Sequence, residues 1–224
     1  MELHETVVVV AGGPGSGIVP PRLGIPAGAP VVAADSGVDR ALALGLRIEV
    51  AVGDFDSVTV EGLETAHAAG ARIERHPDDK DATDLELALD VAVARAPKRI
   101  LVLGSDGGRL DHLLSTLLLL GSARYAGYEL DAALGSSLVH VIRGARELVG
   151  EEGELISLFA LHGSATGVTT DGLLFPLRGE TLEPGSSRGV SNVFASPDAR
   201  IELEHGVLLA IRPGSPTDDE GSTS

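Results

Sequence analysis

The sequence predicts an α/β protein with two parts: an N-terminal domain on a doubly wound, mostly parallel sheet, and a C-terminal all-β sandwich. Up to about residue 130, short apolar runs alternate with helix-like segments, which is the pattern of a parallel sheet. After about residue 133, short strand-like runs follow one another between Gly- and Pro-rich turns, as in a sandwich or barrel. We place the domains at 1–132 and 133–212. We expect 213–224, rich in Pro, Gly, Ser, Thr and acidic residues, to be a disordered tail.

The elements of the N-terminal part can be placed in order along the chain. The first strand is the β-branched run from Thr6 to Ala11, which ends in a glycine turn, as a buried parallel strand does. We expect further strands over residues 31–34, 50–52, 72–75 and 100–103, with 72–75 at a sheet edge. We expect helices over residues 38–44, 60–69, 83–96 and 110–120. The helix over 83–96 has the clearest signals, because Thr83 and Glu86 form a capping box and Pro97 would end it.

The C-terminal part is a series of short apolar or β-branched runs. We expect strands over residues 138–142, 155–159, 165–169, 199–203 and 207–211. No segment here has a helical pattern, so we predict a second domain made of strands alone.

Composition excludes several classes of protein. The hydrophobic content of 43% supports a core, which Ala, Val and Leu must fill because aromatic residues make up only 3%. A net charge of −16 argues against nucleic acid or an anionic membrane as a partner. The chain has no cysteine, which excludes disulfides and thiolate zinc sites and fits a cytoplasmic protein. The apolar runs are too short to span a bilayer, and the N-terminus lacks the basic start of a signal peptide.

Four acidic or glycine-bearing turns follow predicted strands of the N-terminal part. They are Asp35-Ser36-Gly37, Gly53-Asp54-Phe55-Asp56-Ser57, the segment 78–84 and the segment 104–111. Because the carboxyl ends of parallel strands share one edge of a sheet, we expect these turns to converge there. Converging carboxylates repel one another unless a cation lies between them. Mg²⁺ takes oxygen ligands, often one or two carboxylates plus substrate phosphates, so we predict a Mg²⁺ site at this edge.

Asp54 and Asp56 are the centre of this prediction. In an extended segment their side chains would point the same way, while Phe55 would point into the core. The alternative is an ordinary Asp-rich surface turn. Asp84, at the start of the clearest helix, is open to two readings as well, because an Asp there is ordinarily a cap or a dipole partner. Lys80 could neutralise a phosphate or only pair with a neighbouring Asp.

Two glycine-bearing segments could bind phosphate. The segment from Gly107 to His112 opens a helix, where Gly108 lets the backbone approach a ligand and Arg109 could clamp a phosphate. Asp111 could ligate metal or orient Arg109. The turn from Gly12 to Gly17, which includes Gly13, could cradle phosphates too, but no Lys-Ser or Lys-Thr follows as in a P-loop.

In the C-terminal part, Asp171 to Leu177 and Ser187 to Asn192 are the distinctive segments. They could form a ligand site, or they could be hairpin turns with Phe175 in the core.

Taken together, these segments resemble the thiamine pyrophosphokinase family. The resemblance runs in order through six motifs between residues 34 and 194. They are Ala34-Asp35-Ser36-Gly37, Gly53-Asp54-Phe55-Asp56-Ser57, Lys80-Asp81-Ala82-Thr83-Asp84-Leu85-Glu86, Gly107-Gly108-Arg109-Leu110-Asp111-His112, Gly172-Leu173-Leu174-Phe175-Pro176-Leu177 and Gly189-Val190-Ser191-Asn192. The resemblance implies pyrophosphoryl transfer from ATP to the hydroxyl of thiamine, giving thiamine diphosphate and AMP, by a homodimer whose active sites lie at the subunit interface.

The resemblance also implies roles for particular residues. It implies a catalytic centre of Asp35, Asp54, Asp56 and Asp84, with Mg²⁺ on the last three. It implies a nucleotide side of Gly13, Lys80, Thr83, Gly108, Arg109 and Asp111. Ser191 and Asn192 would belong to the thiamine pocket. Thr116, where an Asn often stands, and Val193, where an acidic residue often stands, are the two departures from the family pattern.

Other functions remain open from sequence. The chain could be a pyrophosphokinase that acts on another alcohol, such as a pterin. It could instead be a nucleotide or metal sensor without catalysis, or a structural interaction domain, although the last leaves the clustered carboxylates unexplained.

Overall fold

The sheet of the N-terminal part is centred on β1 (Thr6–Ala11), whose four valines are fully buried. In the computed structural model, which describes residues 5–14, 23–77, 79 and 81–214, the chain divides into two compact units. The first holds Met1–Thr116 and Tyr128–Ser136, and the second holds Leu117–Gly127 and Ser137–Ser224. The predicted limit at residue 132 falls inside a strand of the first unit, Glu129–Leu134, and the domain limits stay a prediction.

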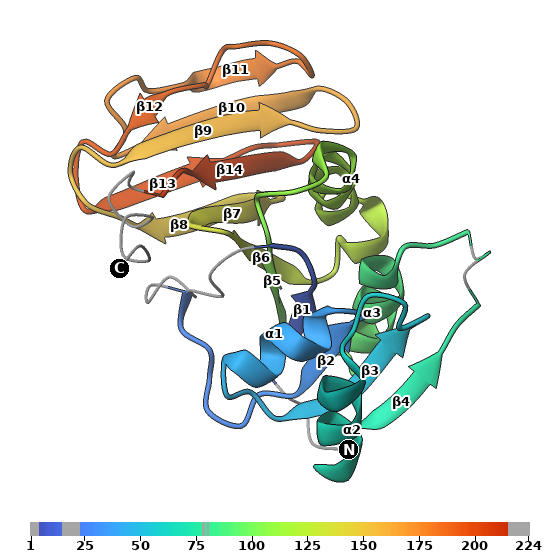
Figure 1. Ribbon diagram of the computed structural model, residues 1–224. Helices are drawn as coiled ribbons and strands as arrows, with labels where there is room; N and C mark the ends of the chain where they lie inside the picture. The colour runs from blue at the N-terminus through green and yellow to red at the C-terminus, as the bar shows by residue number, and fades with distance from the viewer. Residues whose placement is uncertain (1–4, 15–22, 78, 80, 215–224) are drawn as a thin grey trace. The chain divides into compact units, whose positions relative to one another are not determined.

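The first unit is a parallel sheet with helical connections (Figure 1). Its strands lie in the order β6-β5-β1-β2-β3-β4, and every pair along this row is parallel. The remaining strands are β2 (Val31–Ala34), β3 (Ile48–Gly53), β4 (Arg72–Arg75), β5 (Arg99–Gly104) and β6 (Glu129–Leu134). The helices are α1 (Gly37–Ala43), α2 (Val60–Ala68) and α3 (Asp84–Val93), with α4 (Leu110–Leu120) running across the division between the units. The predicted parallel sheet is confirmed, with β4 at its edge.

Two elements of the first unit differ from the sequence prediction. Helix α3 ends at Val93 rather than at Ala96, because Ala96 takes a left-handed backbone conformation (φ 49°) and its N–H bonds to the carbonyl of Val93. Strand β6 was not predicted, because Asp131 interrupts its apolar run. The structure buries this carboxylate to 1% exposure and pairs it with Arg99, whose Nε lies 2.9 Å from Oδ2. A buried charge is tolerated in a strand when it is paired in this way.

From Ser137 onward the second unit is made of antiparallel strands, which confirms the predicted all-β sandwich-like region. These strands lie in two rows, β12-β9-β14-β7 and β11-β10-β13-β8. The remaining segment of the unit, Leu117–Gly127, holds the end of α4 and the 3-10 helix η2 (Ala123–Tyr125). The strands are β7 (Ser137–Ile142), β8 (Ala145–Val149), β9 (Leu155–Ala160), β10 (Ala165–Asp171), β11 (Arg178–Leu182), β12 (Asn192–Val193), β13 (Asp198–Glu202) and β14 (Leu208–Arg212). Sequence missed β8 and β11, whose exposed positions carry charged side chains, and β12, which has only two residues.

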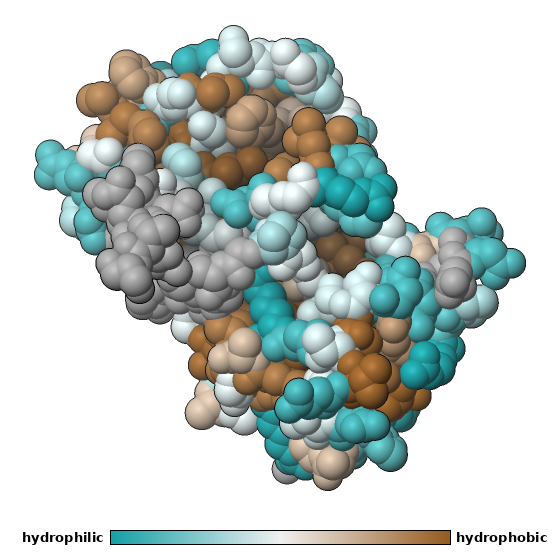
Figure 2. Space-filling view, viewed as in Figure 1, coloured by the Kyte–Doolittle hydropathy of each residue, from teal (hydrophilic) through white to brown (hydrophobic). Residues whose placement is uncertain are grey.

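The core between the strands of the second unit is aliphatic apart from Phe194, which is fully buried. Arg212 lies beside it, with its guanidinium carbon 5.1 Å from the ring centroid. The same guanidinium forms two bonds of 2.8 Å to the carboxylate of Glu154. Apolar side chains also reach the surface of this unit (Figure 2), and the exposed large ones are Leu118, Val149, Leu155, Leu174, Phe175 and Val190.

Of the predicted tail, residues 213 and 214 follow β14 without secondary structure, and residues 215–224 lie outside the described part of the chain. None of the helices formed by the described residues is long and apolar enough to cross a membrane.

Candidate active site

Three carboxylates of the first unit meet at the carboxyl edge of its sheet. Asp35 follows β2, while Asp54 and Asp56 follow β3, the next strand in the sheet. Each of the three can place one carboxylate oxygen within 4.8 Å of the others. The predicted convergence of these residues is therefore present in the structure, and it follows from the strand order because neighbouring parallel strands end at the same edge.

Asp84 joins this cluster from the first residue of α3. A Cβ atom built on Gly53 would lie 3.0 Å from Asp84 Oδ1 and 3.3 Å from the Cβ of Asp35. Gly53 also has φ 148°, which side-chain-bearing residues rarely adopt. The end of β3 thus lies beside both carboxylates, and a side chain at Gly53 would crowd them and strain the backbone.

The backbone around the cluster is left-handed rather than extended. Asp35 has φ 46° and Phe55 has φ 64°, and such conformations cost about 1–3 kcal/mol in residues other than glycine. The extended geometry expected for the Asp54–Asp56 segment is therefore wrong. Phe55 is half-buried instead of in the core, and the Arg75 guanidinium lies 5.0 Å from its ring centroid. Hydrogen bonds hold the turn, because Asp56 N–H donates to Asp54 Oδ1 at 3.2 Å.

The electrostatics of the cluster centre on Asp35. Burial raises the pKa of Asp35, and the charges of Asp84 and Asp56 raise it further, while backbone N–H groups of Ser36 and Ser57 oppose these effects. Its Oδ1 atom is shielded from solvent and has no hydrogen-bond partner within the described chain. A positive ligand would offset both the free-energy cost of burying this charged carboxylate and its repulsion by the other carboxylates.

The donor set fits a hard divalent cation. All the donors are carboxylate oxygens, and hard cations such as Mg²⁺, Ca²⁺ and Mn²⁺ prefer these oxygens to softer ligands. Asp56 is exposed, whereas Asp35 and Asp54 are half-buried, so an ion held here would keep open positions for water or a phosphate on the side of Asp56. Asp54, Asp56 and Asp84 are the residues predicted to hold it; the structure groups Asp54 and Asp56 with Asp35 instead, and Asp84 lies beside this group, close enough for its charge to act on Asp35.

The predicted nucleotide side lies in the turns after β1 and β5. Gly13 has φ 112°, and a Cβ there would lie 2.8 Å from the Cβ of Ser105; Gly108 has φ 83° and its Cβ would lie 3.1 Å from Pro14. Ser105 Oγ donates a hydrogen bond to the carbonyl of Pro14. The two glycine turns therefore touch, which leaves backbone rather than side chains facing this part of the edge.

Arg109 and Asp111 are engaged with each other. Arg109 Nη2 lies 2.6 Å from Asp111 Oδ2, and Nε lies 3.2 Å from Oδ1, with both side chains exposed. The pair raises the pKa of Arg109 and lowers that of Asp111. Of the two roles considered for Asp111, the geometry matches the one that orients Arg109.

The other two predicted nucleotide residues contribute less to the observed geometry. The hydroxyl of Thr83 accepts the N–H of Glu86 at 3.2 Å, which makes Thr83 the cap of α3. Lys80 lies outside the described residues, as do the last three positions of the Gly12–Gly17 turn.

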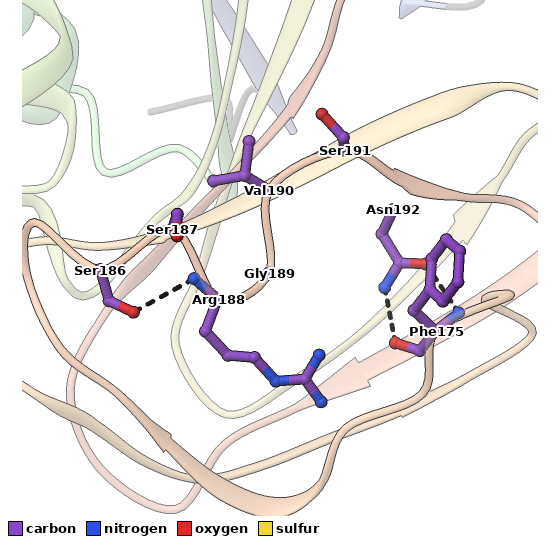
Figure 3. A pocket seen from close by; sticks show the side chains of 8 residues that line it. All are labelled: Phe175, Ser186, Ser187, Arg188, Gly189, Val190, Ser191 and Asn192. Atoms are coloured by element: carbon purple, nitrogen blue, oxygen red, sulfur yellow. Dashed lines mark hydrogen bonds between the residues drawn. The ribbon is translucent and has the colours of Figure 1, made fainter.

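The second unit contains a pocket of about 470 Å³ formed by Phe175 and residues 186–192. Figure 3 shows the Asn192 side chain turned toward the backbone of Phe175. Asn192 Oδ1 accepts the N–H groups of Phe175 and Val193 at 3.0 and 2.9 Å, and Nδ2 donates to the Phe175 carbonyl at 2.7 Å. Asn192 is 2% exposed, so it shapes the wall of the pocket from behind.

Three other residues of the pocket, Phe175, Ser191 and Arg188, are exposed and differ in how they are held. Phe175 is 55% exposed and is not the core residue considered as an alternative. Ser191 is exposed at φ 56°, with its N–H bonded to Ser157 Oγ at 3.0 Å. Arg188 is held by Glu180 through bonds of 2.8 and 2.7 Å. The predicted residues Ser191 and Asn192 therefore lie together in the pocket lining. Phe175, for which sequence left a core position open, lines the same pocket with an exposed ring.

The two departures from the family pattern lie near these sites. Val193 is half-buried and pairs with Leu155 across β12 and β9, and its carbonyl accepts the N–H of Leu174. Thr116 is half-buried on α4. Nothing in the described geometry assigns either of them a ligand contact.

Comparison with known proteins identifies the family. Residues 28–130 match the model "Thiamin pyrophosphokinase, catalytic domain", and residues 139–208 match "Thiamin pyrophosphokinase, vitamin B1 binding domain". Thiamine pyrophosphokinase of Bacillus subtilis (strain 168) is 27% identical over 211 residues, which cover 93% of this chain and 98% of that protein. Thiamine pyrophosphokinase 1 of Oryza sativa subsp. japonica is 27% identical over 175 residues, 73% of this chain and 65% of that protein.

Solved structures agree. The crystal structure of thiamine pyrophosphokinase from Bacillus subtilis superposes with a TM-score of 0.82 at 26% identity and covers 94% of this chain and 99% of that chain. The corresponding protein from Geobacillus thermodenitrificans gives a TM-score of 0.78 at 26% identity, covering 95% of this chain and 99% of that chain. The matches give no support to a pterin-type substrate, a sensor or an interaction domain. The chain belongs to the thiamin pyrophosphokinase family.

Proposed function

We propose that this member of the thiamin pyrophosphokinase family transfers a pyrophosphoryl group from ATP to the hydroxyl of thiamine. The observation that carries the proposal is the convergence of Asp35, Asp54 and Asp56, with Asp84 beside them, within the segment that matches the catalytic-domain model. The pocket of the second unit falls within the segment that matches the vitamin B1 binding model. The products are thiamine diphosphate and AMP.

The reaction requires charge neutralisation and positioning more than covalent chemistry by the protein. The hydroxyl oxygen of thiamine attacks the β-phosphorus of ATP, a new P–O bond forms, the bond from the β-phosphorus to the oxygen bridging to the α-phosphate breaks, and AMP leaves with that oxygen. The hydroxyl proton passes to a base that we leave unassigned. Mg²⁺, when bound, would neutralise the phosphate oxygens and make the β-phosphorus easier to attack.

Each group of residues has a separate role in our proposal. Asp54, Asp56 and Asp84 hold the cation, and Asp35 adds a half-buried carboxylate to the same group. The touching glycine turns at Gly13 and Gly108 leave backbone facing the nucleotide, and Asp111 orients Arg109. Ser191 presents polar groups in the thiamine pocket, whose wall Asn192 holds in place. The acidic centre would also attract thiamine, which is a cation.

The test is direct. The purified protein is incubated with ATP, Mg²⁺ and thiamine, and both AMP and thiamine diphosphate are measured. We expect equal amounts of both products, dependent on thiamine and abolished by a chelator. AMP without thiamine diphosphate, or no product with any nucleotide tested, would exclude the proposed function.

Two further properties are proposals that rest on the family alone. We expect a homodimer with active sites at the subunit interface, and we expect the protein to work in the cytoplasm. Light scattering of the full chain with and without ATP tests the first, and microscopy of a tagged chain in its own cells tests the second.

A further inference from the structure

Arg40, on α1, is a half-buried arginine with two guanidinium nitrogens that are shielded from solvent and lack hydrogen-bond partners among the described residues. These two nitrogens are Nε and Nη1. Within the described part of the chain no carboxylate forms an ion pair with it. Burial lowers the pKa of Arg40, while the charge of Asp106 raises it, but a guanidinium stays protonated in proteins. A buried cation without a partner is costly to the fold, so its retention needs a reason.

The position of Arg40 relates it to the nucleotide side of the sheet edge. Helix α1 starts directly after β2 and packs against the end of β1, because a Cβ on its first residue, Gly37, would lie 2.1 Å from the carbonyl oxygen of Val10. The charge that acts on Arg40 belongs to Asp106, in the loop after β5. Since β1 lies between β2 and β5, Arg40 is at the β1–β5 side of the edge.

Asp106 itself is placed by the fold. Its carboxylate lies over Gly135, where a Cβ would come within 2.1 Å of it. Gly135 follows β6, and its N–H bonds to the carbonyl of Gly104 at 3.2 Å. Asp106 is exposed. Its charge acts on Arg40, but no ion pair joins the two side chains among the described contacts.

The other arginines near this edge are already engaged. Arg109 holds Asp111 through two bonds. Arg75 lies over the ring of Phe55 and donates to the carbonyl of Asp54 at 3.3 Å. Arg40 is thus an arginine at this edge whose guanidinium keeps donors available for a ligand. A guanidinium with open N–H groups in a fixed fork matches the oxygens of a phosphate.

We infer that Arg40 is an anion-binding residue that takes the phosphate chain of the nucleotide. A triphosphate brought to a cluster of four carboxylates needs positive charge in addition to the metal ion, and Arg40 supplies it from the β1–β5 side. The identity of the anion as ATP rests on the proposed function. The existence of the anion site does not, because it follows from the unpartnered guanidinium.

The experiment measures binding rather than turnover. Isothermal titration calorimetry with ATP and Mg²⁺, and separately with inorganic tripolyphosphate, is run on the wild-type chain, Arg40→Met, Arg40→Lys and Arg47→Met. Arg47 is an exposed arginine in the segment after the same helix, so its variant is the matched control. Thiamine binding and thermal unfolding without ligand are measured on all four proteins.

We expect Arg40→Met to weaken binding of both anions by about tenfold or more, the size expected for lost hydrogen bonds to a charged group. The anion affinity of Arg40→Lys should lie between those of the wild type and Arg40→Met, because lysine keeps the positive charge but lacks the forked N–H groups of a guanidinium. Arg47→Met should match the wild type, and thiamine affinity should not change. Without ligand, the melting temperature of Arg40→Met should be equal or higher, since an unpartnered buried charge has been removed.

Two outcomes would overturn the inference. One is anion binding by Arg40→Met that equals that of Arg47→Met. The other is a lower ligand-free melting temperature together with equal losses of ATP and thiamine affinity, which would show that Arg40 only supports the fold. If Arg40→Met does not fold, Arg40→Lys gives the same comparison. Failure of the proposed function would appear differently, as a wild-type chain that binds the anion but forms no thiamine diphosphate.

Discussion

The carboxylate edge of the first unit and the pocket of the second unit are built on opposite principles. At the edge, Asp35, Asp54 and Asp56 lie close enough to repel one another, and their charges and burial disfavour the ionised form of Asp35. In the pocket, the carboxamide of Asn192 and the ion pair of Arg188 with Glu180 satisfy polar groups within the protein. The edge is therefore a site that a ligand completes, whereas the pocket is formed before a ligand arrives. Substitutions should affect stability and activity in opposite ways at the two places.

The largest effect is expected at the edge. Asp56→Asn or Asp84→Asn should lower turnover by about 10³-fold or more, because the metal's charge stabilisation is worth several kcal/mol. Thermal unfolding without metal should show an equal or higher melting temperature, since one repelling carboxylate has gone. Mg²⁺ should raise the melting temperature of the wild-type chain and not of the variants. Thiamine-dependent AMP release retained in both variants would remove the metal site from this edge.

Asn192 should show the reverse pattern. Asn192→Ala removes two buried hydrogen bonds to the Phe175 backbone and one to the Val193 N–H, which should cost about 2–4 kcal/mol of unfolding free energy. We expect a higher KM for thiamine with a smaller change in kcat, because the wall of the pocket moves while the carboxylate edge stays intact. Asn192→Asp keeps the acceptor and loses the donor, so it should lose about half as much stability. A stable Asn192→Ala protein with normal kcat and weak thiamine binding would instead indicate direct substrate contact.

Phe175 separates binding from stability within the pocket. Because the ring is 55% exposed, Phe175→Ala should leave the melting temperature nearly unchanged. Thiamine affinity should fall by about tenfold, as expected when a cation loses an aromatic face worth about 0.5–2 kcal/mol. Leu174→Ala is the control, since Leu174 has the same exposure and no aromatic face. Equal losses in the two variants would mean that the ring contributes only apolar area.

The smallest effect is expected at the Arg188–Glu180 pair, and it depends on pH. The hydrogen bond from Arg188 holds the pKa of Glu180 below its ordinary value of 4.5. A carboxylate with a lowered pKa stabilises the fold above pH 4.5 and loses that contribution as the pH falls through the lowered value. Glu180→Gln should therefore melt slightly below the wild type at neutral pH and match it in acid. Glu147→Gln, which loses only a 3.5 Å contact with Arg200, should show no such convergence.

Sequence alone could predict the frame of the first unit and its carboxylates. The buried strands β1 and β2 are uninterrupted apolar runs, so their position and their parallel pairing follow from pattern. Once the strand ends are placed, the meeting of Asp35 with Asp54 and Asp56 follows from sheet geometry alone. The role of β6 did not follow, because its central Asp131 is acceptable only next to Arg99, which is 32 positions away in the chain.

The finer geometry of the sites could not be predicted, for a different reason. The left-handed backbone at Phe55 and the exposed ring of Phe175 depend on neighbours that are distant in sequence, such as Arg75 and Asn192. Asn192 could be assigned to the pocket from its motif, but a motif cannot show that its amide bonds to backbone. The residue roles at both sites remain predictions that the substitutions above can test.

The geometry at Gly53 also limits which substitutions related sequences can carry at this position. The smallest possible addition at this position, one methyl group, would enter the space shared by Asp84 and Asp35. A change to alanine at this one position would therefore strain the backbone and displace the carboxylates even when all four acidic codons are kept. When related sequences are sorted into active and decayed copies, the codon before Asp54 should be read together with the aspartates themselves.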